Sequence, residues 1–261
     1  MSTNRDVGIR VAVAGGTGRT GRRVVSALQR AGHQTVVMSR SSGVDLVAGQ
    51  GIDRALADVD ALIDVTNTSV ADDDAAREFF ANATGHLLEA EERAGVAHHV
   101  LLSILGVDRV HGNAHYVGKR HQEHLVQTGP VPYTIVRAAQ FHEFAAMVVS
   151  WTRQGQTAVI PPLLVQPVAV SDVADVVATS AVSPARFGTI DLAGPGPQDL
   201  VDMARRTLTR RGESLTLIPS WHDGPFGIEM AGDALLPGPE ALLAPTTFDS
   251  WLESEEAISS G

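Results

Sequence analysis

The sequence contains no cysteine among its 261 residues. Disulfide bonds, thiolate catalysis and cysteine-based metal sites are therefore excluded. No apolar run reaches the roughly 20 residues that a membrane-spanning helix needs. The first residues are polar, and the apolar run from Ile9 has only the length of a strand, so no export signal is visible. We expect a cytoplasmic protein that does not enter a membrane.

Positive charge is scarce as well. Lysine and arginine number 20 against 30 aspartate and glutamate residues, which gives a net charge of −10. This balance argues against a nucleic-acid partner. We expect a small molecule as the binding partner, and the sequence leaves oligomer formation open. The apolar fraction of 44% suits one compact domain, or a large domain with a small lobe.

A metal-binding pattern is also missing. Seven of the ten histidines lie within residues 98–142, and the pairs His111/His115 and His121/His124 have helical spacing. No carboxylates or cysteines cluster with them in the sequence. We therefore predict a histidine-rich helix with a solvated face and no metal site.

Strand-like and helix-like segments alternate through the first two thirds of the chain. The strand-like runs are 10–14, 35–39, 61–66, 99–104 and 133–137, with a short further strand expected at 44–47. The helix-like stretches are 19–30, 73–94, 114–127 and 140–154, with a brief helix near 53–56. This alternation predicts an α/β fold with a doubly wound parallel sheet and helices on both faces.

A glycine-rich segment follows the first predicted strand, with the sequence Gly15-Gly16-Thr17-Gly18-Arg19-Thr20-Gly21. A strand that ends in spaced glycines and leads into a helix is how a dinucleotide-binding fold begins. The glycines allow a sharp turn, leave room for the pyrophosphate and let the helix pack closely on the sheet. The N–H groups at the start of the helix then face the phosphates. The residues predicted to bind the dinucleotide here are Gly15, Thr17, Gly18, Arg19, Thr20 and Gly21.

The end of the second strand distinguishes NAD from NADP. An acidic residue there binds the ribose hydroxyls, whereas a basic residue accommodates a 2′-phosphate. Ser39-Arg40-Ser41 stands at this position, with no carboxylate before Asp45. Arg40 can form a charge-assisted fork with the phosphate, and the hydroxyls of Ser39 and Ser41 add donors. We therefore predict NADP(H), as NADPH, in preference to NAD.

Thr66 and Asn67 follow the strand-like run 61–66. Ligands of open parallel sheets bind at the carboxyl ends of the strands, so we expect both residues to border the cofactor. Asn and Thr also favour the turns at which strands end, which is the simpler explanation of their presence.

The last third of the chain is rich in proline. It still contains predicted helices at 171–183, with Ser171 as N-cap, and at 198–211, and predicted strands at 189–192 and 215–218. We predict a dinucleotide-binding core in residues 1–155 and a C-terminal part in residues 156–261. The second part is expected to complete the sheet and to form a small substrate lobe.

Further motifs carry a resemblance to a known family. They are Leu102-Ser103-Ile104-Leu105-Gly106-Val107-Asp108, Gly118-Lys119-Arg120-x-x-Glu123, Tyr133-Thr134-Ile135-Val136-Arg137-Ala138-x-Gln140-Phe141, Gln166-Pro167-Val168-Ala169-Val170-x-Asp172-Val173-Ala174 and Ala193-Gly194-Pro195. With the glycine segment and Arg40, these motifs make the chain resemble the atypical short-chain dehydrogenase/reductases, in their NmrA-like, NAD(P)H-binding branch. The resemblance implies a Rossmann-type sheet, a dinucleotide site and a C-terminal substrate lobe. It fixes no substrate, because that branch includes reductases of quinones and other small carbonyls as well as proteins that bind NADP without known turnover.

The resemblance also implies catalytic positions. Short-chain dehydrogenases use a serine after a central strand and a Tyr-x-x-x-Lys sequence on the next helix. The tyrosine moves a proton, and the lysine holds the nicotinamide ribose and lowers the pKa of the tyrosine. Ser103 and Lys119 match the serine and the lysine, so both are predicted to be catalytic, with Lys119 also binding the cofactor. Four residues before Lys119, where the tyrosine belongs, stands His115, and Tyr116 is only three before it.

His115 and Tyr116 both stay open as the proton donor. Residues three and four positions away share a helix face with Lys119. Tyr116 could act after a small rotation, and His115 could act as an acid and base because its ordinary pKa is near 6.5. In a third case neither acts and water supplies the proton, as quinone-type acceptors permit.

Large apolar residues suggest where a substrate binds. Phe141 begins a series at helical spacing, which predicts either core packing or the lining of an apolar pocket. Phe141 and His142 are our candidate substrate contacts. Trp221 and Phe226 lie in a loop rich in proline and glycine and are predicted to cap the pocket as a lid.

Three functions are compatible with these features. The first is an NADPH-dependent oxidoreductase that reduces a small apolar carbonyl, enone or quinone. The second is an NADP(H)-binding redox-sensing or regulatory protein with little or no turnover, which the displaced tyrosine favours. The third is a non-redox reaction, such as an isomerisation, in which bound cofactor is structural.

Overall fold

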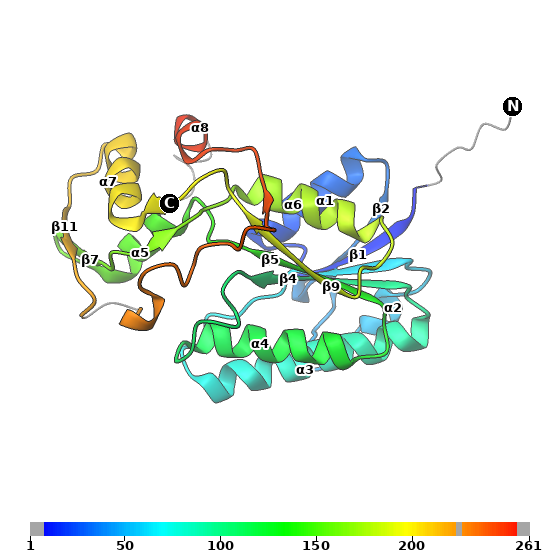
Figure 1. Cartoon of the computed structure of the whole chain (residues 1–261). Helices are drawn as coiled ribbons and strands as arrows, with labels where there is room; N and C mark the ends of the chain where they lie inside the picture. Colours follow the sequence, from blue (N-terminus) through cyan, green and yellow to red (C-terminus); the bar gives the residue numbers. More distant parts are fainter. Residues whose placement is uncertain (1–7, 223–225, 255–261) are drawn as a thin grey trace, which may run out of the picture. The chain divides into compact units, whose positions relative to one another are not determined.

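A sheet of seven strands forms the centre of the fold (Figure 1). The computed structural model describes residues 8–222 and 226–254. The strands of this sheet are β1 (Arg10–Ala14), β2 (Gln34–Met38), β3 (Ala61–Asp64), β4 (His98–Ile104), β5 (Tyr133–Ala138), β9 (Gly188–Ala193) and β12 (Leu242–Leu243). Their order across the sheet is β12-β9-β5-β4-β3-β1-β2. The pairs β1–β2, β1–β3, β3–β4 and β9–β12 are parallel, and the predicted α/β fold with a parallel sheet is confirmed.

Helices connect these strands. They are α1 (Arg19–Arg30), α2 (Ile52–Ala55), α3 (Asp73–Ala94), α4 (Ala114–Thr128), α5 (Phe144–Thr152), α6 (Val170–Ala181), α7 (Leu200–Arg211) and α8 (Phe248–Glu253), with the short 3₁₀ helices η1 (Arg40–Ser42) and η2 (Ile228–Met230). Figure 1 shows α1 and α6 on one face of the sheet and α3 and α4 on the other. Within the described residues, none of the helices is long and apolar enough to cross a membrane.

Two small sheets complete the secondary structure. One pairs β8 (Leu164–Val165) with β10 (Gln198–Asp199), and the other has the order β11-β7-β6. The bounds of that second sheet are β6 (Arg153–Gln154), β7 (Thr157–Ile160) and β11 (Thr216–Pro219).

The structure corrects the strand predicted at 44–47. Residues 40–42 form η1, and Asp45 makes only an isolated antiparallel bridge with Gln50. The Asp45 carboxylate accepts hydrogen bonds from the N–H groups of Val47 and Ala48. These local bonds compete with strand pairing and fold the segment into a turn. Strand β2 therefore ends the sheet on this side.

Three predicted helix starts are also wrong. The helix predicted over 198–211 begins at Leu200, because residues 198–199 form β10 and pair with β8. The helix predicted from residue 140 begins at Phe144, because Gln140–His142 instead pair with Val168: the His142 N–H donates to the Val168 carbonyl, and the Val168 N–H donates to the Gln140 carbonyl. Its predicted end, Gln154, pairs with Thr157 in β6–β7. Ser171 is not an N-cap, since α6 begins one residue earlier, directly after this pairing.

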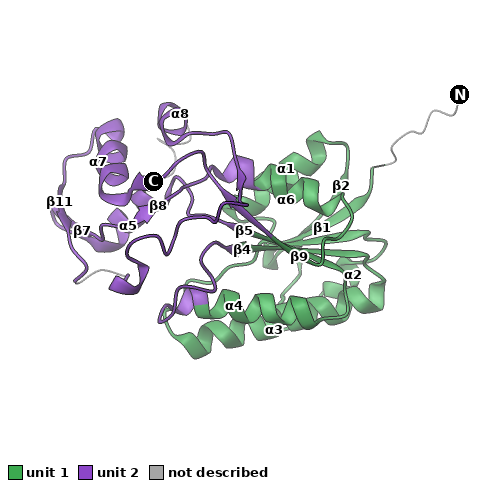
Figure 2. Ribbon diagram, viewed as in Figure 1, with its two compact units in different colours: residues 1–103, 117–136, 174–189 green, residues 104–116, 137–173, 190–261 purple. Residues whose placement is uncertain are grey.

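The chain packs as two compact units (Figure 2). Unit 1 comprises residues 1–103, 117–136 and 174–189, as far as they are described. It contains β1, β2 and β3 and the helices α1, α2 and α3, with the larger part of β4, α4 and α6. One of its cores includes the buried side chains of Met38, Leu62 and Leu87.

Unit 2 comprises residues 104–116, 137–173 and 190–261, again within the described part. Helices α5, α7 and α8 and the two small sheets belong to it. Its core includes Val148, Ile160, Met203 and Trp251, all buried. The strands β4, β5 and β9 each begin in unit 1 and end in unit 2. The predicted division into residues 1–155 and 156–261 concerns function and stays a prediction.

Candidate functional site

Two glycines of the glycine segment, Gly16 and Gly21, pack so closely against the protein's own backbone that neither position has room for a side chain. A Cβ atom on Gly21 would lie 2.2 Å from the Gly15 carbonyl oxygen, and one on Gly16 would lie 2.9 Å from the Val13 carbonyl oxygen. Gly15 has φ +77°, a left-handed conformation that favours glycine. Gly18 is the N-cap of α1, no side chain caps this helix, and its first turn contains no acidic residue. The start of α1 is therefore suited to an anion.

The residues after β2 lie next to this segment. The Gly15 N–H donates to the carbonyl of Met38, the last residue of β2. Ser39 and Ser42 cap η1 reciprocally, which fixes the turn that carries Arg40. The hydroxyls of Ser39 and Ser41 are 2.9 Å apart. Arg40 is exposed, as is Arg19 at the start of α1, so both guanidinium groups are accessible to a ligand.

Two buried hydroxyls lie at the carboxyl ends of β3 and β4. Thr66 is 7% exposed and Ser103 is 5% exposed, and neither Oγ atom has a hydrogen-bond partner among the described residues. In the paired strands Asp64 faces Leu101, so Thr66 and Ser103 follow at matching positions. A Cβ atom on Gly15 would lie 3.3 Å from the Thr66 nitrogen, which places the glycine segment against this strand end. Asn67 is exposed, and its Oδ1 accepts a hydrogen bond from the Thr68 N–H.

Lys119 is buried in unit 1 with a complete set of protein acceptors. Its Nζ donates to the Thr66 carbonyl at 3.0 Å, to the Leu102 carbonyl at 3.1 Å and to Gln122 Oε1 at 2.9 Å. The ammonium also lies 4.8 Å from the centre of the Phe80 ring. Burial lowers the pKa of Lys119 to about 8, although the charges of Asp64 and Glu123 oppose this shift. All three ammonium hydrogens are thus engaged by the protein, and a contact of Lys119 with a cofactor stays a prediction.

His115 and Tyr116 belong to unit 2 and differ in accessibility. His115 is partly exposed, whereas Tyr116 is 3% exposed and forms part of the unit 2 core. The Tyr116 hydroxyl accepts a hydrogen bond from the Gln140 amide at 3.0 Å. Burial raises the pKa of Tyr116 well above its ordinary value, against the opposing effects of Gln140 and Arg109. Of the two candidates, His115 is therefore the better placed to exchange a proton with a ligand.

His142 is buried in unit 2 against the C-terminal helix. Its ring centre lies 5.6 Å from those of Phe248 and Trp251 in α8, and its Nε2 donates to the Thr246 carbonyl at 3.2 Å. Burial lowers the pKa of His142 to about 4, against the effects of Thr246 and Asp172, so the imidazole is neutral at pH 7. Its neighbour Phe141 is partly exposed. The substrate contacts proposed for these two residues stay predictions.

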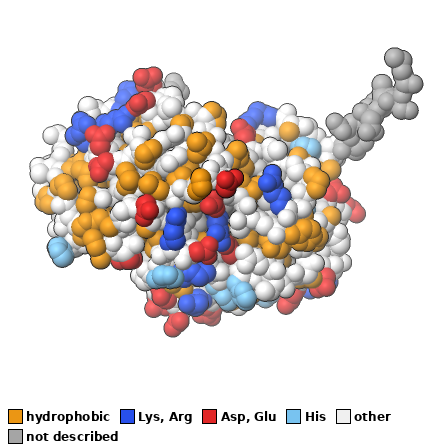
Figure 3. Space-filling model, viewed as in Figure 1, with side chains coloured by type: hydrophobic (Ala, Val, Ile, Leu, Met, Phe, Trp, Pro, Cys, Tyr) orange, Lys and Arg blue, Asp and Glu red, His pale blue; other side chains and the backbone are white. Residues whose placement is uncertain are grey.

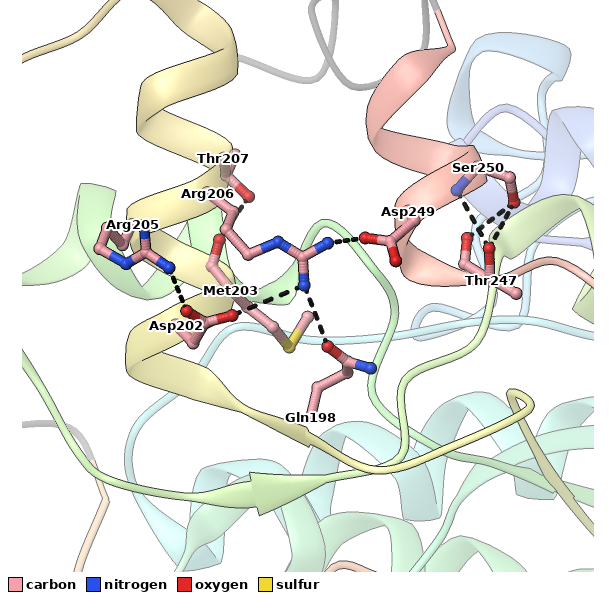
Figure 4. Close-up of polar contacts among 9 residues, drawn as sticks. All are labelled: Gln198, Asp202, Met203, Arg205, Arg206, Thr207, Thr247, Asp249 and Ser250. Carbon is pink, nitrogen blue, oxygen red and sulfur yellow. Dashed lines mark hydrogen bonds and ion pairs between the residues drawn. The ribbon is translucent and has the colours of Figure 1, made fainter.

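Polar contacts hold α8 in place, which explains the burial of His142. Figure 4 shows the Arg206 guanidinium of α7 between Gln198, Asp202 and Asp249. The Thr247 hydroxyl caps α8 by accepting a hydrogen bond from the Ser250 N–H. Because α8 follows His142 by more than a hundred residues in the chain, nothing near His142 in the sequence announces this contact.

The two aromatic residues predicted as a lid lie partly buried against the unit 2 core. The Phe226 ring centre is 5.5 Å from that of Phe144 and 6.3 Å from that of Trp151, and Trp151 is 55% exposed. Figure 3 shows apolar side chains gathered on the visible face of unit 2. Phe226 thus belongs to a partly exposed aromatic cluster, and the role of a lid for Trp221 and Phe226 stays a prediction.

Asp64 and Gln122 were not identified as site residues from the sequence. Nor was it noted there that the chain contains a single lysine. Asp64 ends an otherwise apolar strand and is fully buried, and Gln122 follows Lys119 by three residues. Lys119 is the only lysine of the 261 residues, whereas the other 19 of the 20 basic residues are arginine. An acidic residue within an apolar run and a solitary lysine were the available signals.

Comparison with known proteins identifies the family of the chain. A family model described as NAD(P)H-binding matches residues 15–184, more than half of the chain. A search of curated proteins finds no match.

Several solved structures share the fold. A short-chain dehydrogenase/reductase superfamily protein from Agrobacterium tumefaciens with bound NAD is 20% identical, with a TM-score of 0.69 over 96% of this chain and 96% of that one. An NADPH-dependent quinone oxidoreductase from Escherichia coli is 14% identical, with a TM-score of 0.66 over 93% of this chain and 98% of that one. The UDP-N-acetylglucosamine 4-epimerase from Bacillus cereus is 17% identical, with a TM-score of 0.64 over 81% of this chain and 85% of that one. Such identities show the fold alone. The chain belongs to the NAD(P)H-binding family, with the fold of the short-chain dehydrogenase/reductases that its motifs resemble.

Proposed function

We propose that the protein is an NADPH-dependent oxidoreductase that reduces a small apolar carbonyl, enone or quinone. The observation that carries this proposal is the pair of buried hydroxyls of Thr66 and Ser103, which have no partner among the described residues. A buried hydroxyl without a partner costs roughly 1–3 kcal/mol. Two such groups at neighbouring strand ends, beside the glycine segment, favour a ligand that pairs with them.

The residues around the glycine segment fit a dinucleotide. The uncapped start of α1 and the glycines would hold the pyrophosphate. Thr66 and Asn67 would border the cofactor at the end of β3, with Lys119 behind them. The proposed phosphate-binding residues are Gly15, Thr17, Gly18, Arg19, Thr20 and Gly21. When bound, the reduced cofactor supplies a hydride.

Arg40 is the proposed determinant of NADPH preference. Its side chain is exposed beside Ser39 and Ser41, and residues 39–44 contain no carboxylate that would repel a 2′-phosphate. A guanidinium pairs with a phosphate through two parallel hydrogen bonds. Replacement by Ala is therefore expected to weaken NADPH binding about tenfold and to change NADH binding little.

The proposed chemistry assigns one task to each polar residue. Ser103 would donate its hydroxyl hydrogen to the substrate oxygen and stabilise the negative charge that develops there. His115 would deliver the proton, since its imidazole is partly exposed and an imidazole can both donate and accept a proton, whereas Tyr116 is buried with its oxygen already accepting a hydrogen bond. Phe141 would contact the apolar part of the substrate, with His142 as a second candidate contact.

A cofactor-binding sensor without turnover is the second candidate. It is favoured by the displaced tyrosine: His115 stands where short-chain dehydrogenases have their tyrosine, and Tyr116, one residue later, is buried in the unit 2 core. To separate the two functions, purified protein is mixed with NADPH and a panel of quinones, enones and aldehydes, and the nicotinamide absorbance is followed. Oxidation of NADPH with any member supports the oxidoreductase. Tight binding without oxidation across the panel supports the sensor.

Cofactor preference is tested by the dissociation constants of NADPH and NADH for the parent and for Arg40→Ala. Arg30→Ala, which replaces another exposed arginine of unit 1, is the matched control and should leave both constants unchanged. Equal affinities of the parent for the two cofactors would refute the NADPH preference.

A further inference from the structure

The ammonium group of Lys119, the only lysine of the chain, is surrounded by acceptors whose arrangement matches its geometry. Its three hydrogens are directed to three acceptors, two backbone carbonyls and one amide oxygen, at 2.9 to 3.1 Å. A planar guanidinium cannot present donors in this tetrahedral arrangement. The chain uses arginine at all its other basic positions, so the exception at residue 119 has a geometric reason.

Gln122 connects this ammonium to a buried carboxylate. Gln122 Nε2 donates to Asp64 Oδ2 at 2.9 Å and to Thr84 Oγ1 at 3.1 Å, while its Oε1 accepts from Lys119. Asp64, Thr84 and Gln122 are fully buried. The amide can serve both charged groups only in one orientation, because Asp64 requires its donor and Lys119 requires its acceptor.

The two ends of this chain of hydrogen bonds meet at Thr66. Asp64 Oδ1 accepts from the Thr66 N–H at 2.8 Å, and Lys119 donates to the Thr66 carbonyl at 3.0 Å. Both backbone groups of Thr66 are therefore fixed by buried charges. The backbone of this residue lies against Gly15, and its own hydroxyl is one of the two that lack a protein partner.

We propose that Asp64, Gln122 and Lys119 are positioning residues that hold Thr66 in the geometry needed to bind the dinucleotide. The inference rests on the proposed cofactor function. None of the three side chains needs to touch the ligand. Lys119 holds the Thr66 and Leu102 carbonyls, and Asp64 holds the Thr66 N–H. Gln122 acts indirectly, by orienting Lys119 and Asp64. Buried charges of opposite sign add little net stability compared with apolar side chains of the same size, so their value here is the fixed orientation of the strand ends.

Replacement of the central amide provides the test. Gln122→Met preserves size and removes both connections. We expect it to weaken NADPH binding about tenfold, the effect of one charge-assisted hydrogen bond, and to accelerate hydrogen exchange of the Thr66 amide about tenfold. Lys119→Met and Lys119→Arg should weaken binding by a similar factor, because Arg retains the charge and loses the geometry. The double variant Gln122→Met/Lys119→Met should be no weaker than Lys119→Met alone, since residues that act as one chain are not additive.

A matched control separates positioning from general loss of stability. Glu91→Gln alters another fully buried polar pair of unit 1, Glu91 with His99, and should lower Tm while leaving the NADPH dissociation constant and Thr66 exchange unchanged. The proposal is overturned if Gln122→Met leaves binding and exchange as in the parent. A loss of binding in Lys119→Met but not in Gln122→Met would also overturn it, because Lys119 would then contact the cofactor directly.

Two further outcomes complete the test. Equal losses of affinity in Gln122→Met and Glu91→Gln would overturn the positioning role, since any loss of stability would then have the same effect. If the parent binds neither NADPH nor NADH, the proposed function fails, whereas the exchange measurement still reports on the positioning of Thr66.

Discussion

The buried polar side chains at the two ends of β4 differ in their hydrogen bonds. At the amino end, His98 is hydrogen-bonded to Thr134 at 2.9 Å, and His99 Nδ1 donates to the Glu91 carboxylate at 2.9 Å. At the carboxyl end, the Ser103 hydroxyl has no partner among the described residues. Each histidine at the amino end thus has one ring nitrogen paired within the protein and one without a partner, whereas the Ser103 side chain makes no hydrogen bond among the described residues. The polar side chains at both ends are buried, so the two ends differ in hydrogen-bond partners and not in burial.

The largest effect on stability is expected at the amino end. Glu91→Leu removes the partner of His99, and both side chains are 0% exposed. Burial already raises the pKa of Glu91, despite the opposing effect of His99. Breaking a buried charged pair from one side costs about 3–5 kcal/mol, so the free energy of unfolding should fall by that amount in urea titrations. NADPH affinity, measured at a temperature at which the variant is folded, should equal that of the parent. A loss of affinity would break the contrast between the two ends of β4.

Lys119, which donates to the Leu102 carbonyl near the carboxyl end of β4, makes the stability of the fold depend on pH. Its pKa is about 8 in the folded chain against an ordinary value of 10.5. Between these values the unfolded chain binds more protons than the folded chain, so stability rises with pH. The cost of burying the charged ammonium is fully present below pH 8 and is relieved toward pH 10.5.

The measurement compares the free energy of unfolding of the parent and of Lys119→Met across this range. The difference should shift by about 3 kcal/mol in favour of the parent as pH rises. Other groups that titrate, Tyr116 among them, cancel in the difference between the two proteins. A difference that stays constant with pH would contradict the proposed burial of a charged lysine at the carboxyl end.

Gly21→Ala should abolish most cofactor binding. The added Cβ would lie 2.2 Å from the Gly15 carbonyl oxygen and 2.6 Å from Gly16 Cα, and the backbone must move. We expect the NADPH dissociation constant to rise about 100-fold, or about 2.7 kcal/mol. Gly85→Ala is the control: this glycine lies inside α3, and apart from its chain neighbours and the backbone of its own helix no described heavy atom lies within 4 Å of the position that an added Cβ would occupy. Alanine there should stabilise the helix by about 0.5–1 kcal/mol and leave affinity unchanged.

The smallest effect on stability is expected for Ser103→Ala. Removing a buried hydroxyl that lacks a protein partner should change Tm little or raise it, whereas removal of a paired one costs about 1 kcal/mol. Thr134→Val, at the amino end of β5, supplies the paired comparison. Under the proposed function, Ser103→Ala should reduce turnover by about 100-fold. A marked drop in Tm for Ser103→Ala would show that its hydroxyl is structural.

The signals for the proposed dinucleotide site are local in the sequence. Glycine spacing, a strand before it and a helix after it are contiguous in the chain, and α1 has the predicted bounds of 19–30. Thr66 was identified by a general rule about the ends of parallel strands, and Ser103 by the motif around it. Their lack of a protein partner could not be predicted, since it depends on every side chain around them.

What was missed depends on contacts between distant segments. Gln122 and Asp64 are 58 residues apart in sequence and meet only when α4 packs on β3. The late start of α5 follows from pairing of Phe141 with Val168, which no helical propensity reveals. His142 is covered by a helix from the end of the chain. In each case tertiary pairing overrides a local pattern.

The solitary lysine also provides a natural probe. Acylating reagents attack neutral amines, and among the side chains of these 261 residues only Lys119 offers one. Its low pKa would make it unusually reactive if it were accessible, yet it is 5% exposed. The rate at which the folded protein is labelled at this amine, or cut by a protease specific for lysine, therefore reports how often the carboxyl ends of β3 and β4 separate from α4.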